Sequence, residues 1–553
     1  MRDGLSRVLL AACGAAVLTA CEATAPPPEA VETQPVEAGE TLASLAMPAT
    51  PGSSFWYGGD LAALVGSGPA ANLDAALAGL GGALQGAFVA FENAPDTRPD
   101  LPGTVGVKRY RADRAFNGYT LLTSLGTDFH PTAECPAFSP MNPACAGTVF
   151  GAILVDMQGR VVNEWPLLGF PAKPLPGGNV LGGNLAGGGM PALIQMDWCR
   201  NEVHRWPVPQ EEGYVNTLWH HDFQRAGSPV GYYAPGQIPS ANPEAGTTWL
   251  LVNHVVDWNV WDTRAISDRN KLFDDAFYEV DASGNLLWAW HAWEHVDQMG
   301  FGPKAREAIR NVFVPGGTSD STDWTHMNQL ARLGPNVWYL LGDRRFHPDN
   351  LIFDTRSSGI LGIVARYDNP GRWKAGDVVW RVGPNYGYGN REYRLGQIVG
   401  PHMTHMIPWG LPGAGNILVF DNGGFSGFGA RLPGLPGAVW PNALRDYSRV
   451  VEFNPITLDV VWEFAIPEGP EKFFSTLISG AQRLPNGNTL ITQGGSGRLL
   501  EVTRSGEIVW EYRSPFQGVR FPGGGGFLGP NAVYRAYRAP PSWVPVGTVC
   551  PAP

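Results

Sequence analysis

A short unit that ends in tryptophan recurs along the chain and constrains its fold more than any other feature. Each copy has an apolar residue beside an acidic one, then a turn, an aliphatic pair that is β-branched in all but one copy, and the tryptophan. Trp462 and Trp510 lie 48 residues apart, a spacing typical of one propeller blade. The copies end at Trp165, Trp288 with Trp290, Trp462 and Trp510, and a partial copy ends at Trp380. A strand pair that recurs with a tryptophan is typical of a β-propeller.

A second unit alternates with the first and supports the same fold. Residues 175–181, 411–418 and 484–490 each begin with Leu-Pro and pass through glycine and asparagine into a strand. Such turns connect the strands of hairpins. We therefore predict an all-β fold, a six-bladed β-propeller over residues 105–545. Seven or eight blades fit the length less well, and a pair of β-sandwiches does not explain the alternation of the two units.

The first hundred residues indicate export and a tether. Arg2 and Arg7 precede an apolar stretch that ends at Leu18-Thr19-Ala20-Cys21 and is too short to span a bilayer. This ending resembles the bacterial lipobox, so residues 1–20 are predicted to be a lipoprotein signal peptide and Cys21 to carry lipid. The alternative is an ordinary signal peptide cut nearby. Residues 21–50 read as a flexible tether and 51–104 as a small helical segment.

Glu22 follows the cysteine in place of the aspartate that retains lipoproteins in the inner membrane of enteric bacteria. The expected location is therefore the outer membrane, facing the periplasm. Four further cysteines remain for an oxidising compartment, and an even number suggests two disulfides. Cys135 with Cys145 and Cys199 with Cys550 are the preferred pairs, among three possible pairings. The net charge of −11 argues against nucleic acid as a partner.

Most of the eleven histidines lie between residues 204 and 405. Three groups begin blade-like strand sets, and equivalent strand ends of different blades meet at the centre of a propeller. The groups are His220 with His221, His326 with Asn328 and Arg344, and His402 with His405. Histidines far apart in sequence are therefore expected to lie close together.

The second group suggests an anion site. In an extended strand Trp324, His326 and Asn328 share one face. Arg344 follows an apolar run that we predict to be the neighbouring strand. A guanidinium beside an imidazole suits sulfate or phosphate, because its planar fork matches the oxygens. The alternative is a core histidine bonded to an asparagine, with a surface arginine.

A fourth group, His291-Ala292-Trp293-Glu294-His295, matches the H-x-x-E-H zinc pattern. That pattern needs a helix to place both histidines on one face, and here it follows a strand-like run at 286–290. No downstream carboxylate motif completes a zinc site. We interpret the match as chance and predict neither a metal nor a cofactor.

Three motifs carry a resemblance to a known family. They are Asp323-Trp324-Thr325-His326-Met327-Asn328 with Arg344, the histidines before Phe420-Asp421-Asn422-Gly423, and residues 479–490. Together they resemble the bacterial arylsulfate sulfotransferases. The motifs occur in that family's order, over most of residues 150–515. The resemblance implies a six-bladed propeller that moves a sulfuryl group from an aryl sulfate to a phenolic acceptor without a nucleotide donor.

The resemblance also implies roles for the residues. His326 and Arg344 grip the sulfuryl oxygens, Asn328 assists, and either His220 or His221 completes the pocket. His402, or alternatively His405, is the nucleophile that is transiently sulfated. In a regular strand these two face opposite sides, so only one enters the site. Trp324 is expected to contact the substrate ring. Two alternatives remain, a non-catalytic envelope-anchored scaffold and a quinone-dependent propeller dehydrogenase, although no calcium–quinone acidic ladder is evident.

Overall fold

The computed structural model describes residues 105–550 apart from internal gaps, of which the longest are 134–148, 311–323, 424–444 and 517–530. The predicted signal peptide, tether and N-terminal helical segment lie outside the described residues, as do Cys21, Cys135 and Cys145. Within these described ranges, no helix is long and apolar enough to cross a membrane.

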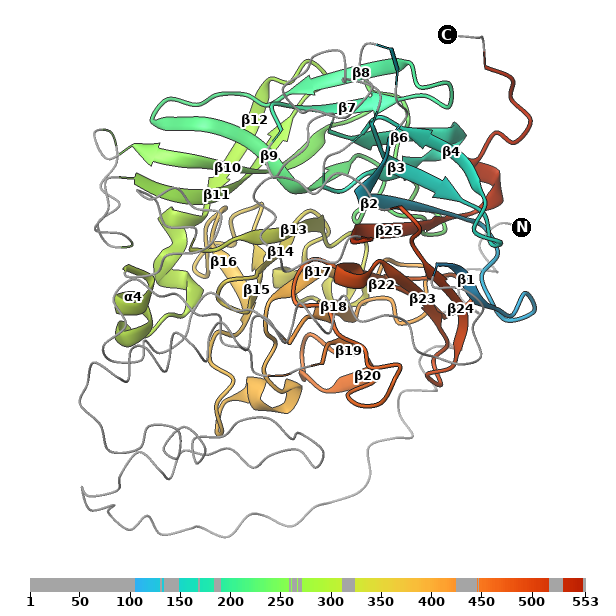
Figure 1. Cartoon of the computed structure of the whole chain (residues 1–553). Coiled ribbons are helices and arrows are strands. Elements are labelled where there is room, and N and C mark those ends of the chain that lie inside the picture. The colour runs from blue at the N-terminus through green and yellow to red at the C-terminus, as the bar shows by residue number, and fades with distance from the viewer. Residues whose placement is uncertain are drawn as a thin grey trace, which may run out of the picture. The chain divides into compact units, whose positions relative to one another are not determined.

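The described strands form six small antiparallel sheets arranged as a six-bladed β-propeller, which confirms the predicted fold (Figure 1). Two blades are β25 (Val533–Ala539), β2 (Tyr119–Phe129), β3 (Val149–Val155) and β4 (Val161–Trp165), then β5 (Lys173–Leu175), β6 (Asn179–Gly182), β7 (Ala192–Met196) and β8 (Glu202–Pro207). The next two are β9 (Tyr214–Arg225), β10 (Thr248–Asp257), β11 (Lys271–Val280) and β12 (Leu286–His291), then β13 (Met327–Arg332), β14 (Leu351–Thr355), β15 (Ile360–Val364) and β16 (Val378–Val382). The last two are β17 (Pro401–Met406), β18 (Ile417–Asp421), β19 (Arg449–Phe453) and β20 (Val460–Ala465), then β21 (Gly480–Arg483), β22 (Thr489–Gln493), β23 (Arg498–Val502), β24 (Ile508–Arg513) and β1 (Gly106–Tyr110).

Each blade has one innermost strand, and the innermost strands contact their neighbours around the propeller axis. They are β25, β5, β9, β13, β17 and β21. Both ends of the propeller sequence close the ring, because C-terminal β25 joins the blade of β2 while β1 extends the blade of β24. The Cys199–Cys550 disulfide, with Cα atoms 5.3 Å apart, confirms one predicted pair and ties the C-terminus to the β7–β8 turn.

Helices among the described residues are short and, apart from η8, lie in the connections between strands. The helix α4 (Pro303–Arg310) lies in the insertion before Asp323. The other helices in the described part of the chain are α5 (Val337–Leu340) and the 3-10 turns η3 (Pro176–Gly178), η4 (Ala292–Met299), η5 (Arg344–Phe346), η6 (Arg391–Leu395), η7 (Gly494–Ser496) and η8 (Pro541–Trp543), which follows the last strand.

The recurring tryptophan joins five of the six blades to the next. In these five the indole Nε1 on the outermost long strand donates to a backbone carbonyl in the last turn of the following blade, at 2.7–3.1 Å. The pairs are Trp165 to Asp197 (2.7 Å), Trp290 to Gly376 (2.8 Å), Trp380 to Pro455 (2.9 Å), Trp462 to Arg504 (3.1 Å) and Trp510 to Met157 (2.9 Å). In the sixth, His204 Nε2 on β8 makes the equivalent contact with Ala282 O at 2.7 Å. The repeat therefore encodes contacts between blades.

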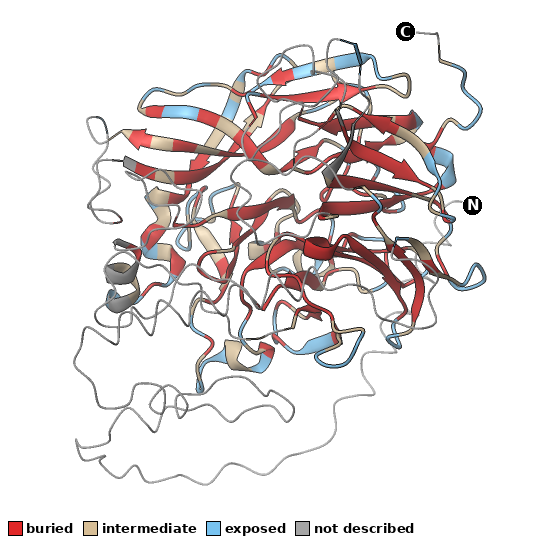
Figure 2. Cartoon of the chain, in the orientation of Figure 1, coloured by how far each residue is buried: buried red, intermediate tan, exposed pale blue. Residues whose placement is uncertain are grey.

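Burial explains why the strands differ in pattern. The middle strands β14, β15, β18 and β22 are buried at every residue, because each sheet packs between two others. Outer β20 alternates between buried and exposed residues. Figure 2 shows the burial concentrated along the inner strands. Polar side chains on those strands are therefore removed from water and need protein partners.

Candidate active site

Three innermost strands bring histidines together at the centre of the propeller. His220 and His221 lie on β9, His326 immediately precedes β13, and His402 lies on β17. The Nδ1 atoms of His220 and His221 are 2.5 Å apart, and the ring centroids of His221 and His326 are 4.9 Å apart. Burial lowers the pKa of His221 well below its usual range, and the proximity of the titratable rings of His220, His326 and His402 lowers it further.

Backbone strain aims these side chains. His221 (φ 54°), His326 (φ 45°), Met403 (φ 54°) and Ile478 (φ 55°) are in the left-handed region, which non-glycine residues seldom adopt. The pairing of β9, β13 and β17 with the next strand shifts register at or beside the first three of these residues. A bulge adds one residue to a strand and redirects its side chains. Each such residue costs roughly 1–3 kcal/mol of strain, which is common at functional sites.

The hydrogen bonds of His402 determine its tautomer. Its Nδ1 lies 2.9 Å from Gly400 O and 2.7 Å from Asn422 Oδ1, two acceptors, so Nδ1 carries the proton. The Asn422 amide cannot be reversed, because its Nδ2 donates to the carbonyls of Ser475 and Ile478. His402 Nε2 accepts the Ile478 N–H at 3.1 Å. His402 is therefore a neutral imidazole with its lone pair on Nε2.

The surroundings keep His402 neutral. Burial lowers its pKa well below the usual range, and the positive charge of Arg535 adds to the effect. Arg535, on β25, has no exposed surface, donates to Asn328 O and lies 3.6 Å from the Asp222 carboxylate. Asp222 is also paired with Lys173 at 2.5 Å. The buried positive charge of Arg535 therefore lies close to the histidines, and it favours an anionic ligand.

His405 lies on the same side of β17 as His402, so the prediction that the two face opposite sides is wrong. His402 pairs with Phe420 and His405 with Leu418, two residues on one face of β18, because the bulge at Met403 inserts an extra residue between the histidines. His405 has no exposed surface, and its Nδ1 and Nε2 contact Met403 O and the Tyr232 hydroxyl, both at 2.8 Å. Burial lowers its pKa to about 4.

Arg344 does not lie beside His326, so this part of the predicted anion site is wrong. The apolar run before it forms α5, and Arg344 begins η5 in the β13–β14 connection. Strand β13 leads away from His326 for six residues, about 20 Å. Arg344 is exposed, donates to the Tyr339 hydroxyl at 2.7 Å and lines a surface pocket of about 500 Å³.

Arg356 occupies the position expected of Arg344. It follows β14, which runs antiparallel to β13 and so returns the chain to His326; the Arg356 N–H donates to His326 O at 3.1 Å. Its charge contributes to lowering the pKa of both His221 and His402. The sequence could have indicated Arg356, because the residue after the second strand of a hairpin lies opposite the residue before the first strand.

Trp324 and Asn328 do not share a face with His326 as predicted. Only β13, from Met327, is a strand, and the positive φ of His326 breaks the alternation. Trp324 has no exposed surface and donates from Nε1 to Asp274 at 2.8 Å, so it cannot contact a substrate ring. Asn328 is also fully buried, and its amide donates to Pro401 O at 3.2 Å. It links the strand of His326 to that of His402.

His220 is held from behind by a carboxylate that the sequence reading missed. Asp275 Oδ1 on β11 lies 3.0 Å from His220 Nε2. Asp275 Oδ2 accepts hydrogen bonds from the Thr325 hydroxyl at 2.5 Å and the Met327 N–H at 2.7 Å. The Asp275 carboxylate therefore fixes the backbone on both sides of His326 and lies within ion-pair distance of His220, without a hydrogen bond between the two.

An apolar surface adjoins the histidines. Tyr534, next to Arg535 on β25, has its ring centroid 5.8 Å from that of His221 and stacks on Phe170 at 5.0 Å. Leu125, Leu477 and Ile478 pack around them, and Phe170, Leu125 and Leu477 keep part of their surface exposed. We call this group the Phe170–Tyr534 cluster. It offers the aromatic contact that Trp324 cannot.

The fold and site define a class of protein: a six-bladed β-propeller with a buried cluster of histidine and arginine at its centre, suited to an oxyanion. The particular family follows from comparison with known proteins. Residues 259–515 match the family model described as Arylsulfotransferase (ASST), which confirms the predicted family. The match supports aryl sulfotransferase activity in general, and the family implies an aryl sulfate donor and a phenolic acceptor.

Other comparisons add less. No curated protein matches the chain. A protein of unknown function from Bacteroides caccae is 12% identical, with a TM-score of 0.37, over 76% of this chain and 98% of that one. A putative 6-phosphogluconolactonase from Bacteroides fragilis is 10% identical, with a TM-score of 0.33, over 78% and 99%. These similarities are too weak to assign a function.

Proposed function

We propose that the protein transfers a sulfuryl group from an aryl sulfate ester to a phenol in two steps, through a sulfohistidine on His402. The observation that carries the proposal is the unprotonated Nε2 of His402, held neutral by two acceptors on Nδ1 and by burial. A neutral imidazole is a competent nucleophile. Sulfuryl transfer resembles phosphoryl transfer, in which the protein mainly positions groups and stabilises charge.

His402 suits this role better than His405. The charges that act on His402 are those of Arg535 and Arg356, and His402 itself acts on His221. His405 instead feels Arg535, Lys173 and Arg483, and it is bonded to the Tyr232 hydroxyl. His402 therefore belongs to the histidine cluster, and His405 supports the core below it.

In the first step His402 Nε2 attacks sulfur, the bond from sulfur to the aryl oxygen breaks, and the phenolate leaves with the electron pair. The Ile478 N–H that caps Nε2 gives way to the donor. Arg356 and His326 hold the sulfuryl oxygens, and their charge and hydrogen bonds act on the equatorial oxygens of the transition state. The Phe170–Tyr534 cluster binds the aryl ring. Phenols that are stable as anions leave most readily, because a neutral His221 has no proton to give from Nε2.

In the second step the acceptor oxygen attacks sulfur and the nitrogen–sulfur bond electrons return to His402 Nε2. His221 takes the phenol proton. Asp275 faces His220 Nε2, so in a neutral pair the protons lie on His220 Nε2 and His221 Nδ1. His221 Nε2 is then free of a proton and acts as the general base. His220 acts as a positioning residue through His221.

The test is incubation with 4-nitrophenyl sulfate and a phenolic acceptor. We expect nitrophenol release and sulfated acceptor, no release by His402→Ala, and a peptide containing His402 that gains the mass of one SO₃ when acceptor is omitted. Release that survives His402→Ala refutes the nucleophile. No release by the parent protein across several donors favours a non-catalytic scaffold.

We propose that the protein is exported and anchored through lipid on Cys21, with its propeller in the periplasm. The Cys199–Cys550 disulfide supports this location, because disulfides persist in oxidising compartments. Fatty-acid labelling tests the anchor: the parent chain should label and Cys21→Ala should not. Labelling of the variant contradicts the assignment.

A further inference from the structure

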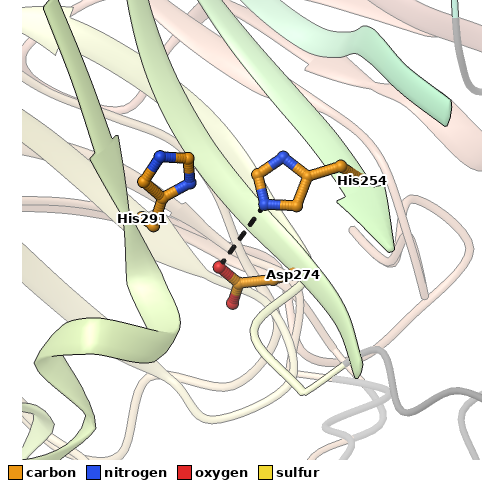
Figure 3. Close-up of side chains that lie close together, drawn as sticks. All are labelled: His254, Asp274 and His291. Atoms are coloured by element: carbon orange, nitrogen blue, oxygen red, sulfur yellow. Dashed lines mark ion pairs between the residues drawn. The ribbon is translucent and has the colours of Figure 1, made fainter. Parts of the chain in front are cut away.

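Three buried metal-binding side chains meet in the blade of His220, outside the groups that the proposed reaction uses. His254 lies on β10, Asp274 on β11 and His291 at the end of β12 (Figure 3). One ligand atom from each lies within 4.8 Å of the others, and His254 Nε2 is 3.9 Å from Asp274 Oδ2. Three adjacent strands of one sheet therefore supply two imidazoles and a carboxylate.

His254 lacks the hydrogen bonds that a buried polar group needs. It has no exposed surface, and neither ring nitrogen makes a hydrogen bond. Leaving a buried polar atom unsatisfied costs about 1–3 kcal/mol. A neutral imidazole with a bare nitrogen is the form that binds a metal ion.

His291 is held as a metal ligand is usually held. Its Nε2 lies 3.2 Å from the Glu211 carboxylate, so Nε2 carries the proton, and its Nδ1 makes no hydrogen bond. Figure 3 shows a ring nitrogen of His291 directed toward His254 and Asp274. Histidine ligands commonly donate their other N–H to a carboxylate, which fixes the tautomer and the ring orientation. Tyr214 stacks on His291 at 4.2 Å and restrains the ring further.

Asp274 is oriented, but no lysine or arginine among the described residues pairs with its buried carboxylate. Its Oδ1 accepts the Trp324 Nε1–H at 2.8 Å, and its Oδ2 accepts the Trp293 N–H at 3.2 Å. A divalent cation would supply the missing charge. Glu211 has 32% of its side chain exposed, so the cluster lies one side chain below the surface.

We propose that His254, Asp274 and His291 bind one divalent first-row transition-metal ion, with Zn²⁺ the best match, and that Glu211 positions His291. Two imidazoles and one carboxylate suit zinc and its neighbours, whereas Ca²⁺ and Mg²⁺ prefer oxygen ligands. Three protein ligands leave at least one coordination position. The ion joins β10, β11 and β12 and, through Asp274 and Trp324, supports the segment that carries His326.

The H-x-x-E-H match turns out to share one residue with this site, but not its geometry. His291 ends a strand and His295 lies in η4, with its ring stacked on Trp290 at 5.0 Å and Nδ1 3.3 Å from Gln298 Oε1. His295 is therefore the matched control, because the motif requires it and the three-residue site does not.

The test measures metal content and Co²⁺ binding with the full chain. After purification with zinc present we expect about one zinc per chain in the parent protein and in His295→Gln. His254→Gln and Asp274→Asn should lose the metal, and Glu211→Gln should bind it 10–100-fold more weakly, as expected for a group that orients a ligand. Added Co²⁺ should give visible absorption bands of a bound ion in the metal-stripped parent and in His295→Gln, but not in His254→Gln.

A second measurement needs no variant and stays informative if His254→Gln fails to fold. The melting temperature of chelator-treated parent protein should rise as Zn²⁺ is added, because an ion that binds only the folded state stabilises it. A parent chain that carries no metal, shows no Co²⁺ bands and melts at the same temperature with Zn²⁺ overturns the site. Equal metal loss in His295→Gln and His254→Gln also overturns it. Neither result bears on the nucleophile, which is tested by sulfation of His402.

Discussion

Replacing Asn422 tests how His402 works without removing the nucleophile. The Asn422 Oδ1 lies 2.7 Å from His402 Nδ1. As Nε2 forms its bond to sulfur the imidazole gains positive charge, so this hydrogen bond strengthens in the transition state. Interactions that are stronger in the transition state than in the ground state raise the rate of the chemical step. Asn422→Ala should therefore slow the first step.

The structure sets the size of the effect. A hydrogen bond to a charged group contributes about 1.5–3 kcal/mol. Gly400 O remains 2.9 Å from the same Nδ1 and keeps the proton there, so the loss should fall at the low end, about 1.5–2 kcal/mol. At 1.4 kcal/mol for each factor of ten, the first-step rate should fall about 10–30-fold.

Asn422→Asp adds a second readout. It keeps the acceptor but places a carboxylate beside His402, which raises the pKa of that imidazole. The protonated fraction then grows as the pH falls, and a protonated His402 cannot attack. The variant should approach the parent rate at alkaline pH and lose activity at a higher pH than the parent does.

Both variants are measured by single-turnover release of nitrophenol from 4-nitrophenyl sulfate, from pH 5 to 9, without acceptor. Asn416→Ala is the control, since Asn416 bonds to Glu452 at the opposite end of β18. A parent-like rate in Asn422→Ala together with an unshifted pH profile in Asn422→Asp refutes the assignment of Nε2 as the attacking atom.

Three further predictions follow from the same contacts. Arg356→Ala should lower kcat/KM by about 100-fold or more, which is the usual effect of losing one group that stabilises a transition-state anion. Arg344→Ala should stay within about twofold of the parent protein. A larger loss in Arg344→Ala than in Arg356→Ala, measured by steady-state kinetics, contradicts the site. Trp462→Phe removes one contact between blades and should lower the free energy of unfolding by about 1–2 kcal/mol in urea titrations, whereas Trp409→Phe, half-exposed, changes it by less than about 0.5 kcal/mol. The pKa of His405 is lowered to about 4, so between the ordinary value near 6.5 and about 4 the unfolded chain binds more protons than the folded chain. The free energy of unfolding should therefore fall by about 1.4 kcal/mol for each pH unit below 6.5. Urea midpoints measured at pH 7 and pH 5 should show this loss of stability, and His405→Phe should show a smaller loss.

The sequence was a good guide to the fold because the contacts between blades involve one residue type. Trp380 and its counterparts need a fixed turn in the following blade, so the repeat marks both the strand and its neighbour. The sequence does not reveal the one exception. In β8 the contact between blades comes from His204, whereas Trp206, two residues further on, makes no hydrogen bond through its Nε1. A repeat search finds residue types, whereas the propeller requires only a donor at that position.

The site was harder to predict because it depends on departures from regular strands. Alternation assigns Trp324 to the face of His326, but the positive φ of His326 turns the two apart. The same assumption separated His402 from His405, and the bulge at Met403 reversed it. The apolar run before Arg344 predicts a neighbouring strand, whereas it forms α5 and β14 instead returns Arg356 to the site. Bulges and hairpin lengths depend on packing against neighbouring blades, which a single sequence does not display.

The strained residues explain how a rigid ring holds reactive groups ready for substrate. Free strands would relax at His221 and Met403, since left-handed backbone costs roughly 1–3 kcal/mol at each. Here β9, β13 and β17 each pack against neighbouring inner strands, and the indole contacts and the two closing strands hold the blades in place. Relaxation of one bulge would therefore disturb at least two blades. Because the ring maintains this strain before a ligand arrives, the one local change that the histidines need to meet the sulfate is the withdrawal of the Ile478 N–H from His402 Nε2. Such preorganisation is the main source of electrostatic stabilisation in enzymes.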